Sequence, residues 1–315
     1  MTRERAIDRV GIHDWGTHPC PPEHLRTLLA EAEEIDCGFE VCETDEAADF
    51  DGVVTLFHHD EFLDGVEWVH NIRSGYEDFP LDAYRERGVT MTNSTGVAGD
   101  LVGETVTGLV LTLAKGLHRF RDRQHDKAWE RLHWRRPFEV SGSTACVVGL
   151  GELGGSAASR LGVLGMDVEG VDIRPVSGLG LDRVYDPARI ETAVADARFV
   201  VLTTPLTDAT RGLVDQSVFE AMRDDAYLVN VSRGEIVVEE DLVTALETDE
   251  IAGAALDVFY DEPLPADAPF WEMENVVVTP HAAAQAATYG DRIADLVATN
   301  VGRLNDGGTP WNQVV

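Results

Sequence analysis

The stretch Ala145-Cys-Val-Val-Gly149-Leu-Gly151-Glu-Leu-Gly154 decides the fold of this chain. Its three glycines have the spacing GxGxxG, follow an apolar run and precede a predicted helix from Glu152 to Leu164. In such a strand–turn–helix the first glycine permits a tight turn, the second lets the backbone approach a pyrophosphate, and the third allows close helix–strand packing. The helix N-terminus adds free N–H groups and the positive end of a dipole. The motif therefore predicts a dinucleotide site.

Asp172 ends the next predicted strand, 172 − 149 = 23 residues after the first glycine. A carboxylate there accepts hydrogen bonds from the adenosine ribose and repels a 2′-phosphate, so we expect NAD as the cofactor. Arg174 leaves NADP as an alternative cofactor, because a guanidinium can bind that phosphate. The expected cofactor contacts of this region are Gly149, Gly151, Glu152, Leu153, Gly154, Asp172, Ile173 and Arg174.

Predicted strands and helices alternate on both sides of the motif. Apolar strands are expected at 9–15, 39–42, 52–57, 68–72 and 89–92, and again at 145–148, 168–172, 198–203, 227–231, 254–258 and 276–279. Predicted helices lie at 21–35, 81–87, 98–117, 120–132 and 286–304. Strands that are apolar on both faces and separated by helices indicate parallel sheets covered on both sides. The sequence predicts an α/β fold of two Rossmann-like parallel-sheet domains, with an active-site cleft between them.

The charge of the chain excludes several classes of protein. It has 57 acidic and 25 basic residues, a net charge of −32, and only Lys115 and Lys127 are lysines. Such a chain repels nucleic acid and anionic membranes, so neither is expected as a partner. No apolar segment predicts a signal peptide or a membrane span, and the four cysteines lack metal or disulfide spacing. We expect a cytoplasmic protein.

Three polar residues follow successive predicted strands of the second half. Arg233, Glu262 and His281 each lie just past a strand end, where an open parallel sheet faces its ligand. A guanidinium holds a carboxylate and polarises the adjacent carbonyl, and a histidine with a carboxylate behind its ring moves a proton. Taken singly, each has a structural explanation as a surface ion pair, a solvated loop charge or a packing residue. Together they predict hydride transfer to a keto acid.

The run His58-His59-Asp60-Glu61 has the composition of a metal site. Adjacent residues of an extended segment point to opposite faces, so no metal is expected there. We expect Phe57 to His59 to line a pocket for the side chain of the substrate.

At this point the chain resembles the D-isomer-specific 2-hydroxyacid dehydrogenases. The resemblance runs through the segments 72–76, 92–94, 102–104, 149–154, 204–207, 230–234, 256–259, 262–264 and 279–281. It implies that Arg233 anchors the substrate, that His281 is the acid/base and that Glu262 is its partner. It further implies a substrate-binding loop of Ser74, Gly75 and Tyr76, and cofactor contacts from Thr204, Pro205, Leu206, Val231 and Asp257, the last to the nicotinamide carboxamide.

The resemblance also implies an organisation of the whole chain. Residues 1–94 and 284–315 form a discontinuous substrate domain, and residues 95–283 form the dinucleotide-binding domain. The helix at 98–117 resembles the family's dimer-forming helix, so a homodimer is expected, with an ordinary core helix as the alternative. The acidic, lysine-poor composition resembles the haloarchaeal branch.

The expected activity is reduction of 2-oxoacids to D-2-hydroxyacids with NAD(P). Tyr76 stands where many members have a smaller aliphatic residue, so the size of the substrate does not carry over. Glyoxylate/hydroxypyruvate reductase and phosphoglycerate dehydrogenase specificities remain alternatives, although a phosphate requires more basic groups than the sequence offers. An NAD-sensing binding protein, like the C-terminal-binding-protein corepressors, is the alternative outside the enzymes.

The charge generates a first prediction. Self-repulsion at −32 destabilises the compact state until salt screens it, so we expect full folding only in concentrated salt. Thermal unfolding curves in dilute buffer and in molar KCl measure this effect. Curves that coincide would contradict it.

Overall fold

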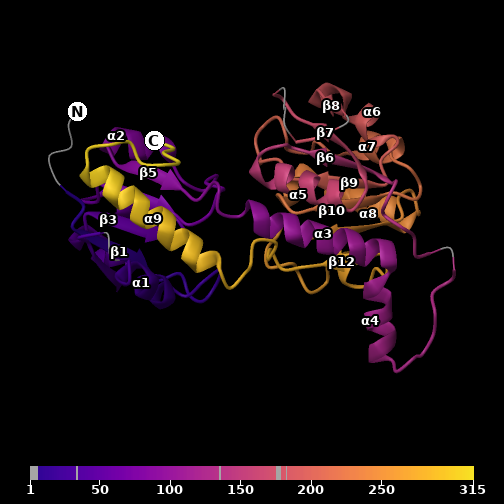
Figure 1. The fold of residues 1–315 in the computed structure, drawn as a ribbon, viewed down its shortest axis with the longest axis horizontal. Helices are drawn as coiled ribbons and strands as arrows, with labels where there is room; N and C mark the ends of the chain where they lie inside the picture. The colour runs from indigo at the N-terminus through magenta and orange to yellow at the C-terminus, as the bar shows by residue number, and fades with distance from the viewer. Residues whose placement is uncertain (1–5, 33–34, 135, 175–178, 182) are drawn as a thin grey trace. The chain divides into compact units, whose positions relative to one another are not determined.

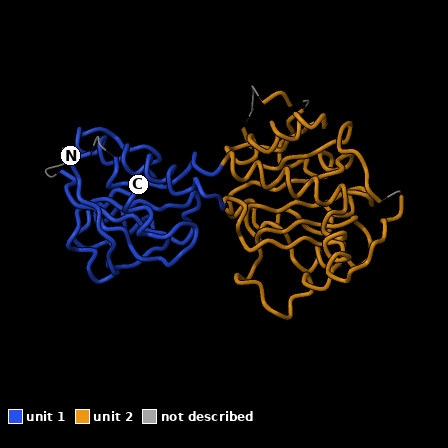
Figure 2. The backbone as a smooth tube through the Cα atoms, turned by 60° about the horizontal axis from the view of Figure 1, so that its bottom comes forward, with its two compact units in different colours: residues 1–98, 285–315 blue, residues 99–284 orange. Residues whose placement is uncertain are grey.

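The computed structural model describes residues 6–32, 35–134, 136–174, 179–181 and 183–315. The chain divides into two compact units, which Figure 2 shows in blue and orange. Unit 1 comprises residues 1–98 and 285–315, and unit 2 comprises residues 99–284. The C-terminal segment therefore belongs to the same unit as the N-terminal segment.

Unit 1 is built on a five-stranded parallel sheet with the order β2-β1-β3-β4-β5. Its strands are β1 (Arg9–His13), β2 (Gly38–Cys42), β3 (Gly52–Thr55), β4 (Trp68–Asn71) and β5 (Thr90–Asn93). Its helices are α1 (Pro22–Ala30), α2 (Leu81–Arg87) and α9 (Tyr289–Asn305). Every residue of β3 and β4 is buried, as expected for a parallel sheet covered on both faces. Helices α1 and α9 pack against each other (Figure 1).

Unit 2 is built on a seven-stranded parallel sheet with the order β12-β11-β10-β9-β6-β7-β8. Its strands are β6 (Thr144–Val148), β7 (Asp167–Val171), β8 (Arg183–Tyr185), β9 (Phe199–Leu202), β10 (Tyr227–Asn230), β11 (Gly253–Leu256) and β12 (Val276–Val278). Its helices are α3 (Gly99–Lys115), α4 (Leu117–His125), α5 (Glu152–Val163), α6 (Ile190–Val194), α7 (Gln216–Ala221) and α8 (Glu239–Glu247). The two parallel-sheet units confirm the predicted Rossmann-like α/β fold class.

The direction of winding in unit 2 reverses between two neighbouring strands. From β6 the chain proceeds to β7 and β8 on one side, and then to β9, β10, β11 and β12 on the other. At such a switch point the loops after the two strands lead to opposite faces and leave room for a ligand at the carboxyl edge. The glycine motif follows β6, so the topology places it at this point.

Two predicted helices are longer in the sequence analysis than in the structure. The prediction of a helix at 120–132 is wrong beyond His125, where α4 ends. None of the residues of α4 is buried, so no tertiary packing stabilises a longer helix. Trp129 is instead fully exposed. The helix expected at 21–35 ends at Ala30. Acidic residues follow it, and negative charge is unfavourable at the C-terminal end of a helix, where the helix dipole is negative. Residues 33 and 34 of that prediction lie outside the described residues.

The edge strand β8, residues Arg183–Tyr185, was not predicted because three residues show no usable alternation. Within the described ranges, no helix is long and apolar enough to cross a membrane.

Candidate active site

The glycine turn after β6 has the geometry that its sequence requires. Gly149 has φ +91°, a conformation that side chains other than glycine rarely adopt. Thr203, just after β9, donates its hydroxyl hydrogen to the carbonyl oxygen of Gly149 at 2.7 Å. A Cβ on Gly154 would lie 1.8 Å from that same carbonyl oxygen. The turn is thus held between two neighbouring strands and the first turn of α5.

The N-terminus of α5 fits the phosphates of a dinucleotide. Gly151 is the N-cap residue, and no side chain caps the helix, so its first N–H groups remain available. A Cβ on Gly151 would meet nothing within 4 Å, which means that the space in front of the helix is open. The hydroxyl oxygen of Thr204 beside it is buried and has no hydrogen-bond partner among the described residues. An uncapped helix, an open approach and an unpartnered hydroxyl suit an anionic ligand.

The other predicted cofactor residues lie around this turn. Glu152 directs its carboxylate to the backbone N–H of Gly99 at the start of α3, so only its backbone remains for a ligand. Leu153 is the next residue of α5, and Val231 is buried just after β10. Pro205 and Leu206 follow β9, and Ile173 is 83% exposed after β7.

Asp172 lies beside the glycine turn at the end of β7. Its carboxylate accepts hydrogen bonds from the backbone N–H of Leu150 at 2.8 Å and of Arg174 at 2.9 Å. Arg174 also pairs with it through Nε at 3.3 Å. Burial raises the pKa of Asp172, but these hydrogen bonds and the Arg174 charge outweigh burial and leave the pKa below its ordinary value. The side chain is therefore a charged acceptor at neutral pH.

His281 and Glu262 form a directly bonded pair at the same edge of the sheet. The distance from His281 Nδ1 to Glu262 Oε2 is 2.7 Å, and 45% of the His281 side chain is exposed. Burial raises the pKa of Glu262, yet the hydrogen bond and charge of His281, the N–H of Phe259 and the charge of Arg233 lower it further than burial raises it. Glu262 therefore stays ionised and orients the ring.

Arg233 follows β10, the strand next to β11 in the sheet. Asn230 shapes this turn, because its side-chain amide donates to the carbonyl oxygen of Arg233 at 3.0 Å. A Cβ on Gly234 would lie 2.1 Å from the carbonyl carbon of Phe259, so the backbone after Arg233 is in close contact with the segment that leads to Glu262. The structure thus brings Arg233, Glu262 and His281 to neighbouring strand ends.

Asp257 fixes the segment that carries His281. The carboxylate is 1% exposed. One oxygen accepts hydrogen bonds from the Thr279 hydroxyl at 2.5 Å and the Ala282 N–H at 2.9 Å, and the other accepts from the Ala283 N–H at 2.9 Å. The N–H of His281 bonds to the Asp257 carbonyl oxygen at 2.8 Å, and His281 has φ +50°. This network stabilises a conformation that non-glycine residues rarely adopt.

The predicted substrate residues of unit 1 lie at the carboxyl edge of its own sheet. Asn71, at the end of β4, donates to the Gly75 carbonyl oxygen at 2.7 Å, and Asn93, at the end of β5, donates to the Ser74 carbonyl oxygen at 2.6 Å. Two buried amides therefore shape the loop of residues 74–76, whose Tyr76 is 38% exposed.

Phe57 lies close to Arg73, the residue that precedes this loop. Its ring is 45% exposed, and the Arg73 guanidinium lies 5.6 Å from the ring centroid. Arg73 also pairs with Asp78 at 2.8 Å, so the arginine connects Phe57 to the segment after β4.

The histidines that follow Phe57 bond to separate partners. His58 contacts the Tyr84 hydroxyl at 3.0 Å and Asp60 at 3.2 Å, and the His59 ring packs against His13 with a centroid distance of 4.7 Å. Among the described residues, no group of three or more His, Cys, Asp or Glu side chains could hold a metal ion.

The sequence analysis missed the residues that hold these loops in place. Thr203, Asn230, Asn71 and Asn93 are all at least 92% buried, and each bonds a backbone carbonyl of a neighbouring turn. Their shared signal is a polar residue at or just after the end of an apolar strand. Such a residue is buried only if it is hydrogen-bonded, which predicts a structural role beside the site.

The doubly wound parallel sheet, with a glycine turn at its switch point, defines unit 2 as a dinucleotide-binding domain. The family model described as D-isomer specific 2-hydroxyacid dehydrogenase, NAD binding domain, matches residues 107–283. The chain belongs to the D-isomer specific 2-hydroxyacid dehydrogenase family, as its sequence predicts, and is an oxidoreductase with an NAD-binding domain.

Curated relatives include two named reductases. The chain is 33% identical over 252 residues to a glyoxylate reductase of Thermofilum pendens, an alignment that covers 75% of this chain and 71% of the relative. It is 32% identical over 238 residues to a glyoxylate reductase/hydroxypyruvate reductase of Mus musculus, covering 74% of this chain and 71% of the relative.

Solved structures of the family share the fold over nearly the whole chain. A family protein from Aeromonas salmonicida subsp. salmonicida superposes with a TM-score of 0.85 at 27% identity, covering 98% of this chain and 99% of that one. A Xanthobacter autotrophicus protein in complex with NADPH and MES superposes with a TM-score of 0.81 at 26% identity, covering 99% and 98%.

Three glycines of α5 and its turn provide a matched test of the cofactor site. Gly154→Ala should lower both NADH affinity and thermal stability, since its Cβ meets a backbone oxygen. Gly151→Ala should lower NADH affinity alone, since its Cβ enters open space where the ligand approaches. Gly162→Ala, exposed near the C-terminal end of α5, should lower neither. Fluorescence titration with NADH and thermal melts measure these effects; equal affinities in all three variants would refute the assignment.

Proposed function

We propose that this chain is an NAD(P)-dependent reductase that converts 2-oxoacids to D-2-hydroxyacids by reversible hydride transfer. The observation that carries this proposal is the 2.7 Å hydrogen bond between His281 Nδ1 and Glu262 Oε2, at the strand edge that also bears Arg233 and the glycine turn. A proton-transfer pair, a guanidinium and a dinucleotide site at one edge are what the reduction of a carbonyl beside a carboxylate requires.

Arg233 binds and polarises the substrate in this proposal. Its guanidinium accommodates a carboxylate and withdraws electron density from the adjacent carbonyl, whose oxygen becomes negative as the carbon is reduced. The nicotinamide, when bound, supplies the hydride. Asp257 holds the segment after β12 and, as the resemblance implies, receives a hydrogen bond from the carboxamide.

His281 moves the proton. Glu262 occupies Nδ1, so Nε2 is the ring nitrogen left to protonate the carbonyl oxygen during reduction, or to take the hydroxyl proton in the reverse direction. Glu262 is a positioning residue, since it acts on the substrate only through the imidazole.

The loop of Ser74, Gly75 and Tyr76 in unit 1 supplies further N–H groups for the substrate carboxylate. Its carbonyl oxygens are engaged by Asn71 and Asn93, which supports a loop shaped to present the N–H groups. Phe57 and Tyr76, both partly exposed, are proposed to contact the substrate side chain.

Glyoxylate and hydroxypyruvate are the favoured substrates within this proposal, because curated relatives at 32–33% identity are named as reductases of these compounds. The test is a panel of 2-oxoacids, from glyoxylate to branched chains and 3-phosphohydroxypyruvate, assayed with NADH and NADPH in molar KCl. Turnover of small unphosphorylated 2-oxoacids supports the proposal. NADH binding without turnover of any compound would refute it and favour a cofactor-sensing binding protein.

The pH dependence tests the His281–Glu262 pair. We expect His281→Ala to lower kcat by roughly 10²- to 10⁴-fold, the usual contribution of a general acid. In Glu262→Gln kcat should also fall, because an amide does not hold the imidazole as a carboxylate does, and the fall in kcat that follows protonation of Glu262 at acid pH should be absent. Glu247→Gln, an exposed carboxylate at the end of α8, is the control.

Glu262 sets the direction of this pH dependence. Its pKa lies below the ordinary 4.5, so the pairing is present above that value and is lost as pH falls through the lowered one. A pH profile of Glu262→Gln that overlays the wild-type profile would contradict the positioning role.

Asp172 is expected to select the cofactor. Its charged carboxylate favours ribose hydroxyls and opposes a 2′-phosphate, whereas Arg174 beside it can bind one. Asp172→Ala should therefore raise kcat/KM with NADPH relative to NADH. An unchanged ratio would show that another residue makes the choice.

We also propose a homodimer. Helix α3 packs on α5, while α4 extends away from the sheet of unit 2 and the segment after it returns to the sheet (Figure 1). This extension exposes Phe120 by 38%, Trp129 by 103% and Trp134 by 75%. Grouped apolar side chains of this kind mark association surfaces. Sedimentation velocity should give a dimer for the wild type and for Trp271→Ser, and a monomer for the double variant Phe120→Ser/Trp129→Ser.

A further inference from the structure

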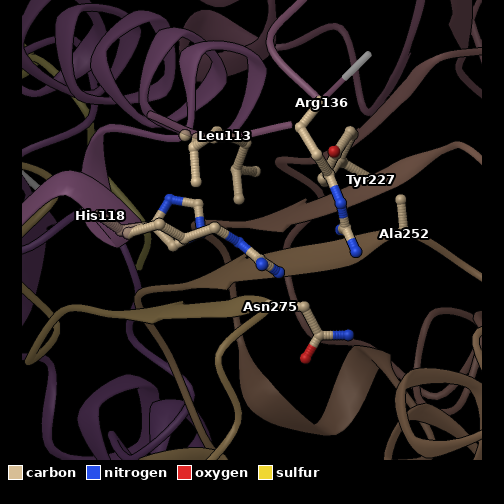
Figure 3. Close-up of a pocket in the computed structure, with 9 residues that line it drawn as sticks. Leu113, His118, Arg136, Tyr227, Ala252 and Asn275 are labelled. Atoms are coloured by element: carbon tan, nitrogen blue, oxygen red, sulfur yellow. The ribbon is translucent and has the colours of Figure 1, made fainter. Parts of the chain in front are cut away.

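A small basic pocket lies at the amino edge of the unit 2 sheet, opposite the strand ends that carry the candidate active site. Its volume is about 20 Å³, and it is lined by Leu113, Gly116, His118, Arg119, Leu132, Arg136, Tyr227, Ala252 and Asn275. Tyr227 begins β10, while Ala252 and Asn275 immediately precede β11 and β12. Figure 3 shows the side chains of His118 and Arg136 reaching into the pocket from opposite sides.

Positive charge gathers here although the chain has a net charge of −32. Burial raises the pKa of Tyr227, and the charges of Arg198, Arg136 and Arg119 oppose that shift, so all three guanidinium groups lie within electrostatic reach of its hydroxyl.

Carboxylates neutralise this charge only in part. Asp225 pairs with Arg198 and with Arg223. Glu274 lies 3.7 Å from Arg119, but its side chain is 87% exposed, so water screens the pair. No carboxylate of the described residues forms an ion pair with Arg136, which is therefore a cation without a protein counterion.

The walls of the pocket are preorganised. The Tyr227 ring stacks on Phe138 at 6.0 Å and on Phe199 at 5.4 Å, with interplanar angles of 19° and 20°. Arg198 lies 4.0 Å from the Phe138 centroid, and Lys115 donates to the Phe138 carbonyl oxygen at 2.6 Å. The aromatic stack thus forms one rigid wall beside these cations, while the Arg136 residue itself is exposed.

The size of the pocket decides the ligand. A cavity must offer roughly 10–15 Å³ to hold one water molecule, so about 20 Å³ admits one water-sized species. A monatomic anion is the ligand that so small a volume suits best.

We propose that this pocket binds a single chloride ion, held by the guanidinium groups of Arg119 and Arg136 and the hydroxyl of Tyr227. The ion supplies the counter-charge that Arg136 lacks. It also connects three separate segments: the start of α4, the segment that precedes β6, and the amino edge of the sheet at β10. Bound chloride therefore acts differently from salt screening, because it holds the start of α4 and the segment before β6 against the sheet of unit 2.

Chlorine-35 NMR tests the site on the full chain. The line width of chloride is measured in a background of potassium glutamate, so that potassium and ionic strength stay constant. Wild-type protein should broaden the chloride line, and bromide should reverse the broadening by competition. Arg136→Gln and Arg119→Gln should each lose at least half of the excess width, whereas Arg85→Gln, whose residue pairs with Asp82 in unit 1, should lose none.

No excess width in the wild type, or equal widths in all variants, would overturn the proposal. Crystals grown in KBr give a measurement that needs no variant. An anomalous bromine peak between Arg119 and Arg136 supports the site, and an empty pocket in bromide-saturated crystals refutes it. Both results are independent of catalytic activity, so failure of the chloride site and failure of the reductase proposal are separate outcomes.

Discussion

The candidate active site depends on the hydrogen bonds of one buried carboxylate. Asp257 directly follows β11; its carboxylate oxygens accept from Thr279, Ala282 and Ala283, and its carbonyl oxygen accepts from His281. A buried charge without such partners would be strongly unfavourable, so this network and the folded loop require each other. Because the loop is fixed, His281 keeps its positive φ and its bond to Glu262. The hydrogen-bonded pair of His281 and Glu262 is therefore a consequence of the packing behind it.

The same design recurs along both sheets. A polar side chain at a strand end is buried and bonds the backbone of the next loop: Thr203 for the glycine turn, Asn230 for Arg233, and Asn71 with Asn93 for the loop of residues 74–76. Parallel strands place all these ends at one edge of each sheet. The candidate site residues of each unit are thereby gathered at that edge. The basic pocket lies at the opposite edge of the unit 2 sheet, and there the arginine side chains determine which ligand we propose.

Much of the fold was accessible to sequence analysis because its signals are local. Apolar runs bounded by turns gave the strands of both sheets, and GxGxxG gave the turn whose Gly149 has φ +91°. The extent of α4 was overestimated, because helical composition continues past His125 but nothing packs against it. Edge strand β8 was missed, because three residues carry too little periodicity.

The sequence by itself determined the class of the fold and the dinucleotide turn, and it singled out Arg233, Glu262 and His281 as candidate site residues, because each signal is a residue type at a strand end. Only the tertiary structure decided which side chains meet. The bond between residues 262 and 281, the contact of Gly234 with Phe259, and the convergence of Arg119, Arg136 and Tyr227 on one pocket join segments far apart in the chain. Such contacts follow from strand order and packing, which no local pattern specifies.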